Sequence, residues 1–177
     1  MEKENFMISH LKRLASITSG RQREFFIFEL QNANEVAPVS IHDVFTTEEI
    51  ERIKREVRPE KKHCIKNATL MTQYFPDVVY VEGELGIAGV IGTEHAFNRR
   101  GDKYFDITVE ICLGKDVTKE SYISILEEDD KDALTQFNID TKIYGAYIPY
   151  YHEKFNNESH RSIKEVKRRV EERLSLE

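Results

Sequence analysis

The spacing of apolar residues changes along the chain, and this change constrains the fold more than any other feature. Before about residue 75, apolar residues recur every three or four positions, as at Met7, Leu11 and Leu14, which predicts helices. From Val78 to Ile148, runs rich in β-branched and aromatic residues, bounded by glycine and charged residues, predict consecutive strands. Helices followed mainly by neighbouring strands favour an α+β fold, in which helices pack on an antiparallel sheet.

Start and stop signals define the helices of the first part of the chain. The opening helix stops at Ser19-Gly20, and the apolar run 24–30 is either a buried strand or a helix. Thr46 and Glu49 can form a capping box, which predicts that a helix begins there, and Pro59 ends it. The buried stripes predicted for this helix and the next are Ile50, Ile53 and Val57, and then Cys64, Ala68, Met71 and Phe75.

The second part of the chain is predicted to be mainly strands. The predicted strands are 78–82, 94–98, 103–111, 122–126 and 142–148. The four glycines between 83 and 92 indicate a flexible connection, and the acidic stretch 127–130 indicates a solvated loop. From Ser162, apolar residues at helical spacing predict a surface helix with one buried stripe.

Composition and charge exclude several classes of function. With 177 residues, of which 40% are hydrophobic, the chain has enough apolar material for one domain with a real core. The net charge of −6 gives no field that would attract a phosphate backbone, so we expect no nucleic-acid partner. No apolar run approaches the ~18 residues of a membrane span, and the first residues lack a secretory signal, so we expect no membrane association. Two cysteines are too few for a disulfide framework, which favours a cytoplasmic protein with free thiols.

The predicted hairpin brings a histidine and an aspartate together. If it turns on Arg100-Gly101, then Arg99 faces Asp102 and His95 lies directly opposite Asp106. Directly opposed side chains point to the same face of a sheet, with Cβ atoms roughly 4.5–5.5 Å apart. A carboxylate at that distance can accept a hydrogen bond from the imidazole, which fixes the tautomer and stabilises the imidazolium. The pairing depends on the turn, because a different turn length would shift the register.

Cys64 can supply a nucleophile beside this pair. A cysteine at a helix start is exposed to the positive end of the helix dipole and to free backbone N–H groups, and both favour the thiolate. The preceding Lys61-Lys62-His63 adds positive charge. The same N–H groups, including that of Cys64, could hold the oxyanion that forms when a thiolate attacks a carbonyl. A single cysteine on an apolar helical face is most often a core residue, so it is the coincidence with His95 and Asp106 that favours catalysis.

Four short motifs carry a resemblance to a known family. They are His63-Cys64-Ile65-Lys66-Asn67-Ala68, Tyr80-Val81-Glu82-Gly83, Glu94-His95-Ala96-Phe97 and Tyr104-Phe105-Asp106-Ile107-Thr108. In content and order the segment from Cys64 to Thr108 resembles the core of transglutaminase-like cysteine enzymes, within the broader papain-like group. It differs in having Phe97 where the family often has Trp, Ile107 where it often has Pro, and no Gly before Cys64.

The resemblance implies a fold and an activity. It implies a transglutaminase-like core in which Cys64 is the nucleophile, His95 the base and Asp106 the residue that orients the base. We therefore expect a cysteine hydrolase or acyltransferase that acts on a peptide, amide or other acyl substrate through a thioester, with no cofactor. The single domain 1–177 would comprise a helical part, about 1–60, a catalytic core, about 61–112, and C-terminal strands and a helix, about 120–177.

Two other interpretations remain open. His63, Cys64, His95 and Asp106 offer ligands suited to zinc, but no Cys-x-x-Cys or His-x-x-x-His spacing occurs and adjacent residues such as His63 and Cys64 usually diverge, so we expect no metal site. Alternatively, the chain is a non-enzymatic binding module on the same scaffold. Its contact surface would then be the glycine-rich loop and the aromatics Tyr144, Tyr147, Tyr150 and Tyr151.

Overall fold

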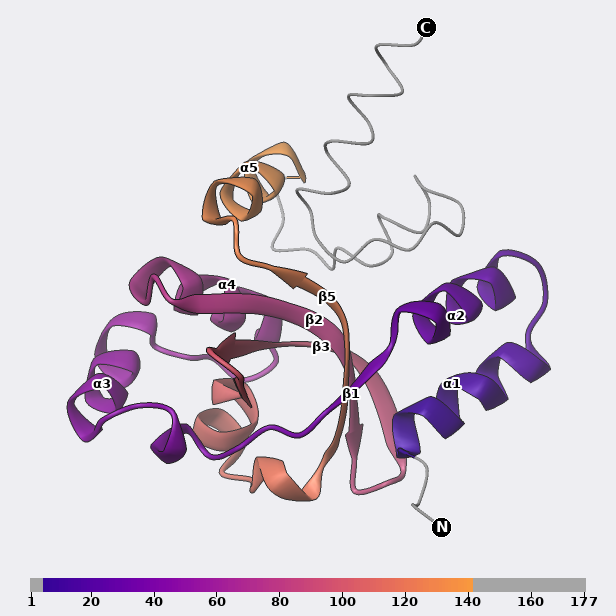
Figure 1. The fold of residues 1–177 in the computed structure, drawn as a ribbon, viewed down its shortest axis with the longest axis horizontal. Coiled ribbons are helices and arrows are strands. Elements are labelled where there is room, and N and C mark those ends of the chain that lie inside the picture. The colour runs from indigo at the N-terminus through magenta and orange to yellow at the C-terminus, as the bar shows by residue number, and fades with distance from the viewer. Residues whose placement is uncertain (1–4, 142–177) are drawn as a thin grey trace, which may run out of the picture.

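A computed structural model describes residues 5–141 of the protein (Figure 1). The helices are α1 (Phe6–Ile17), α2 (Gly20–Asn32), α3 (Thr47–Arg52), α4 (Cys64–Tyr74) and α5 (Lys131–Thr141). The strands are β1 (Asn34–Val36), β2 (Val78–Ile87), β3 (Ile91–Arg100), β4 (Lys103–Phe105) and β5 (Ser121–Glu128). Four short helical segments complete this part of the chain: η1 (Ile41–Asp43), η2 (Ile53–Val57), η3 (Thr108–Cys112) and η4 (Val117–Lys119).

The five strands form one antiparallel sheet in the order β1-β5-β2-β3-β4. Its centre is the long hairpin of β2 and β3, which pair over ten residues each, from Val78 with Arg100 to Ile87 with Ile91. The short strand β4 pairs with β3 only from Asn98 to Arg100. The remainder of that edge of β3 is therefore free of a neighbouring strand among residues 5–141.

Helices cover one face of the sheet and short segments pack on the other. Apolar side chains of α1, α2 and α4 share a buried cluster with Tyr80 and Ala96, which point to the helical face. On the opposite face, Val81 and Phe97 pack against η3, η4 and Tyr122 of β5. This arrangement confirms the predicted α+β fold with helices on an antiparallel sheet.

The predictions with local signals are confirmed. Met7 and Leu11 are buried in α1, and the ambiguous run 24–30 is part of the helix α2. Thr46 accepts a hydrogen bond from the N–H of Glu49, whose carboxylate accepts one from the N–H of Thr46, so the capping box is complete. The helix continues through η2, whose last residue precedes a left-handed residue and Pro59. Helix α4 begins at Cys64 as predicted.

The predicted strand 103–111 is wrong beyond Phe105. The side chain of Asp106 accepts hydrogen bonds from the backbone N–H groups of Thr108 and Val109, and its carbonyl accepts one from Glu110. Such contacts are those of a residue that caps a helix, and they compete with strand pairing. The chain therefore turns into η3, which ends at Cys112.

Two further expectations for the second part of the chain are corrected. The glycines predicted to form a flexible connection mostly belong to β2 and β3, and only 88–90 make the turn between them. In the acidic stretch, Glu127 and Glu128 belong to β5, and Glu128 is fully buried, so only Asp129 and Asp130 fit the predicted loop. The predicted strand 142–148, the helix from Ser162 and the tyrosine surface lie outside the described residues.

None of the helices found in residues 5–141 has the length and apolar character needed to cross a bilayer.

Gly83 provides a test of the sheet geometry. A Cβ atom at Gly83 would lie 2.0 Å from the backbone oxygen of Ile123 in β5, next to the register shift between Glu82 and Gly83. We expect Gly83→Ala to lower the free energy of unfolding by about 2 kcal/mol or more, because neither backbone can yield without breaking sheet pairing. Gly89→Ala meets no atom within 4 Å and strains only a positive φ, so its loss should be nearer 1 kcal/mol. Urea denaturation of both variants measures the difference, and equal losses would contradict this close packing.

Candidate active site

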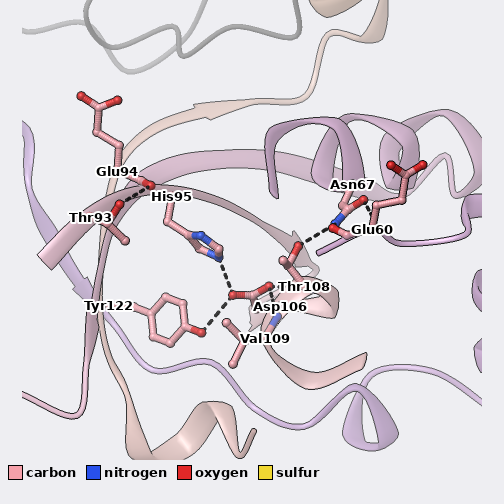
Figure 2. Close-up of polar contacts among 9 residues, drawn as sticks. All are labelled: Glu60, Asn67, Thr93, Glu94, His95, Asp106, Thr108, Val109 and Tyr122. Carbon is pink, nitrogen blue, oxygen red and sulfur yellow. Dashed lines mark hydrogen bonds and ion pairs between the residues drawn. The ribbon is translucent and has the colours of Figure 1, made fainter. Parts of the chain in front are cut away.

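His95 and Asp106 form a short, buried contact (Figure 2). Nε2 of His95 lies 2.6 Å from Oδ2 of Asp106, and the two side chains are only 7% and 1% exposed. His95 comes from β3, and Asp106 directly follows β4. Because Nε2 is occupied by the carboxylate, Nδ1 is the ring nitrogen that remains for another partner.

The structure reaches this contact through a register other than the predicted one. Arg100 pairs with Lys103, so the hairpin turns on Gly101-Asp102, with Gly101 at positive φ. In that register Phe97, rather than His95, is the position level with Asp106. Residues 95 and 97 of one strand point to the same face, so Asp106 stays on the side of His95 and meets it diagonally. The predicted direct opposition is wrong, and the predicted proximity is confirmed.

Each oxygen of the Asp106 carboxylate accepts two hydrogen bonds. Oδ2 accepts from His95 and, at 3.0 Å, from the hydroxyl of Tyr122, and Oδ1 accepts from the N–H groups of Thr108 at 2.9 Å and Val109 at 3.0 Å. A buried carboxylate is stabilised as an anion when several N–H and O–H groups donate to it. Burial and the adjacent charge of Asp106 raise the pKa of Tyr122, so its hydroxyl keeps the proton that it donates.

Cys64 completes a series of contacts with these two residues. It is the first residue of α4 and is partly exposed. Its sulfur lies close enough to the ring of His95 and to the backbone N–H of Ala96, at the edge of β3 that β4 leaves open, for both groups to lower the pKa of the thiol. The three residues predicted from the sequence are therefore brought together in the order Cys64, His95, Asp106.

The charges of this series shift the pKa values in opposite directions. Burial alone would raise the pKa of the Cys64 thiol, but the hydrogen bond and positive charge of His95, with the Ala96 contact, lower it below the ordinary value of 9.0. Burial alone would lower the pKa of His95, but the charge and hydrogen bond of Asp106, assisted by Cys64, raise it to about 10. Both shifts favour a thiolate facing an imidazolium.

The start of α4 can also accommodate a developing negative charge. Within residues 5–141, His63 stands at the N-cap of α4 without a side-chain capping bond, and its carbonyl accepts from the N–H of Asn67. The N–H groups of the first turn have no carbonyl partner within the helix. They lie at the positive end of the helix dipole, beside the sulfur, where an oxyanion would form.

Asn67 and Tyr122 support the site, and the sequence reasoning assigned no role to either. Asn67 is fully buried and donates to Oγ1 of Thr108 at 3.0 Å and to the carbonyl of Glu60 at 2.8 Å, which ties α4 to the segment that follows Asp106. The sequence feature that could have drawn attention to Asn67 is its place in the same motif as Cys64. Nothing local distinguishes Tyr122 from other strand tyrosines, since its role depends on where β5 lies in the sheet.

No group of three or more histidine, cysteine or carboxylate side chains within residues 5–141 has the arrangement of a metal site. Comparison of the chain with models of protein families, with curated proteins and with solved structures finds no match. The resemblance of the segment from Cys64 to Thr108 to transglutaminase-like enzymes therefore stays a prediction.

The raised pKa of His95 predicts a pH dependence of stability. Its folded-state pKa, about 10, exceeds the ordinary value of 6.5, so protonated His95 stabilises the fold fully below about pH 6.5 and this contribution is lost as the pH rises towards 10. Asp106→Asn removes the main cause of the raised value and should flatten this loss. Urea denaturation between pH 6.5 and 10 measures it, in a Cys64→Ala background that removes the thiol titration. Parallel pH profiles with and without Asp106→Asn would contradict the assigned charge coupling.

Proposed function

We propose that the protein is a cysteine-dependent acyl hydrolase or acyltransferase, built on a transglutaminase-like core. The observation that carries the proposal is the continuous series of contacts from the Cys64 sulfur through the His95 ring to the buried Asp106 carboxylate. A cysteine at a helix start, a histidine on the neighbouring sheet and an aspartate that orients the histidine are the parts that thiol acyl transfer requires. Their order along the chain supports the family proposal.

The first half-reaction transfers the acyl group to the protein. The Cys64 thiolate attacks the carbonyl carbon of an amide or ester, a C–S bond forms, and the carbonyl π electrons move to the oxygen. The N–H groups at the start of α4 stabilise this oxyanion. When the tetrahedral intermediate collapses, the bond to the leaving group breaks, and the leaving amine or alcohol takes a proton from the His95 imidazolium. The products are a thioester at Cys64 and a neutral His95.

The second half-reaction regenerates the thiolate. Neutral His95 takes a proton from water, in hydrolysis, or from an amine, in transfer, and the activated nucleophile attacks the thioester carbonyl. Collapse of this second intermediate breaks the C–S bond, releases a carboxylic acid or a new amide, and returns the thiolate facing a protonated His95. Asp106 holds the ring in both steps, with Nε2 bound and Nδ1 directed to the reacting groups.

Alkylation rates test the activation of Cys64. Each unit by which the pKa of a thiol falls gives about tenfold more thiolate below that pKa. We expect iodoacetamide at pH 6.5 to label Cys64 at least about tenfold faster than Cys112, whose pKa is raised by burial and by the charge of Asp106. His95→Gln should slow labelling of Cys64 about tenfold or more. Mass spectrometry of the labelled peptides reports both rates in one sample.

Matched variants separate activation from simple access to the thiol. Cys112→Ser should leave the rate at Cys64 unchanged, and Cys64→Ser should abolish thioester formation with a panel of acyl probes. A slow Cys64 that is indifferent to His95→Gln would contradict the proposed nucleophile.

A further inference from the structure

The two oxygens of the Asp106 carboxylate accept from different kinds of donor. Oδ1 accepts from the backbone N–H groups of Thr108 and Val109, which hold the carboxylate to the start of η3. Oδ2 accepts from two side chains, the ring of His95 at 2.6 Å and the hydroxyl of Tyr122 at 3.0 Å (Figure 2). Two side-chain donors therefore share the one oxygen that faces the histidine.

The sheet and aromatic packing hold Tyr122 in this position. The residue is fully buried in β5, and it pairs with Leu85 of β2 on one side and with Val36 of β1 on the other. Its ring centroid lies 5.3 Å from that of Phe97 and 6.4 Å from that of His95, in both cases edge to face. Because two strands and two rings fix the ring of Tyr122, its hydroxyl stays directed at the carboxylate.

Other ionisable groups near this contact have partners of their own. Glu110 of η3 accepts from the hydroxyl of Ser40 and from the N–H of Ile41. Glu120, just before β5, accepts from the N–H of Ala88. Within residues 5–141, no side chain other than those of His95 and Tyr122 donates to Asp106. The remaining ionisable groups that act electrostatically on this site or are acted on by it are Cys64 of α4, Glu84 of β2 and Cys112 of η3.

A hydrogen bond to a carboxylate weakens that carboxylate as a partner for a second donor. Each donor stabilises the anion and makes it a weaker base. Burial alone would lower the pKa of His95, and the charge of Asp106 is the largest of the effects that raise it. The hydroxyl of Tyr122 keeps its proton, because burial and the charge of Asp106 raise its pKa. It therefore reduces the preference of the ring for the charged form.

We propose that Tyr122 is a positioning residue of the site, whose hydroxyl limits the negative charge that Oδ2 of Asp106 presents to the ring of His95. The N–H groups on Oδ1 already fix the orientation of the carboxylate, so the hydroxyl acts on its charge. In the proposed reaction His95 must hold a proton beside the thiolate and then release it to the leaving group. Without the hydroxyl, Asp106 would hold the imidazolium more tightly. The inference rests on the proposed function for its purpose, and its effect on His95 can be measured without a substrate.

Titration of His95 tests this role. The Cys64→Ala protein has no thiolate at the site, and nitrogen NMR of its labelled histidine rings across pH gives the pKa of His95, with His95→Gln identifying the signals. Adding Tyr122→Phe removes the hydroxyl and keeps the ring. We expect it to raise the pKa of His95 by about half a unit or more, which is about threefold tighter binding of the proton. An unchanged or lowered pKa would overturn the inference.

Tyr104→Phe is the matched control. The hydroxyl of Tyr104 donates to another carboxylate, that of Glu127, at 2.7 Å, so its removal makes the same chemical change away from Asp106. This variant should leave the pKa of His95 where it is in the Cys64→Ala protein. A rise as large as that from Tyr122→Phe would show a general effect of losing a hydroxyl and would equally overturn the assigned role.

Fluorination tests the same contact without removing the hydroxyl, and it decides the matter if Tyr122→Phe does not fold. Replacing every tyrosine by 3-fluorotyrosine makes each phenol a stronger donor, so the pKa of His95 in the Cys64→Ala protein should fall. A rise or no change would contradict the role of Tyr122.

The alkylation of Cys64 separates this inference from the proposed function. Rapid labelling of Cys64 that depends on His95, without a change in the pKa of His95 on Tyr122→Phe, would support the proposed nucleophile and overturn the role of Tyr122. The expected rise in that pKa, together with a slow Cys64 that is indifferent to His95→Gln, would support the role of Tyr122 and count against the proposed chemistry.

Discussion

The buried carboxylate of Asp106 is the interaction on which the rest of the structure depends. At 1% exposure an anion must be compensated by donors, and Asp106 receives four, from three separate parts of the chain. The N–H groups of Thr108 and Val109 end the strand and begin η3. The hydroxyl of Tyr122 joins β5, and the ring of His95 joins β3. One side chain therefore sets where β4 stops, how the next segment leaves the sheet, and which way the histidine faces.

The same carboxylate explains why ionised groups persist where burial would neutralise them. His95 stands between Asp106 and Cys64, so its positive charge has a negative neighbour on each side. Each neighbour favours the charged form of the ring, and the ring in turn favours the thiolate. Removal of one member would leave the others as uncompensated buried charges, which is the usual reason why such a series behaves as a unit. The short β4 contributes by leaving the Ala96 edge open for the sulfur.

Local signals in the sequence predicted more than long-range ones. The capping box of Thr46 and the helix start at Cys64 depend on a few neighbouring residues and were readable directly. The meeting of His95 and Asp106 was predicted with a turn placed one residue too early. It was still correct because that error moves the position level with His95 by two residues, which keeps the face of the sheet. The helical turn after Asp106 was missed because the β-branched residues that follow it favour a strand. That preference outweighed the ability of an aspartate to cap a helix in the sequence interpretation. The role of Tyr122 follows from strand order and could not be read from its neighbours in sequence.

The alternation of β3 divides the chemistry between the two faces of the sheet. Odd positions carry His95 and Phe97 towards η3, and even positions carry Glu94 and Ala96 towards the helices. The backbone of Ala96 meets the sulfur at the strand edge, so the thiol borders both faces. The residues proposed for proton transfer lie in the buried layer on one face, while the carboxyl groups of Glu84 and Glu94 lie on the face that the helices cover. A change at Glu84 therefore alters neither the His95 tautomer nor the hydrogen bonds of Asp106, because Glu84 lies on the opposite face of the sheet.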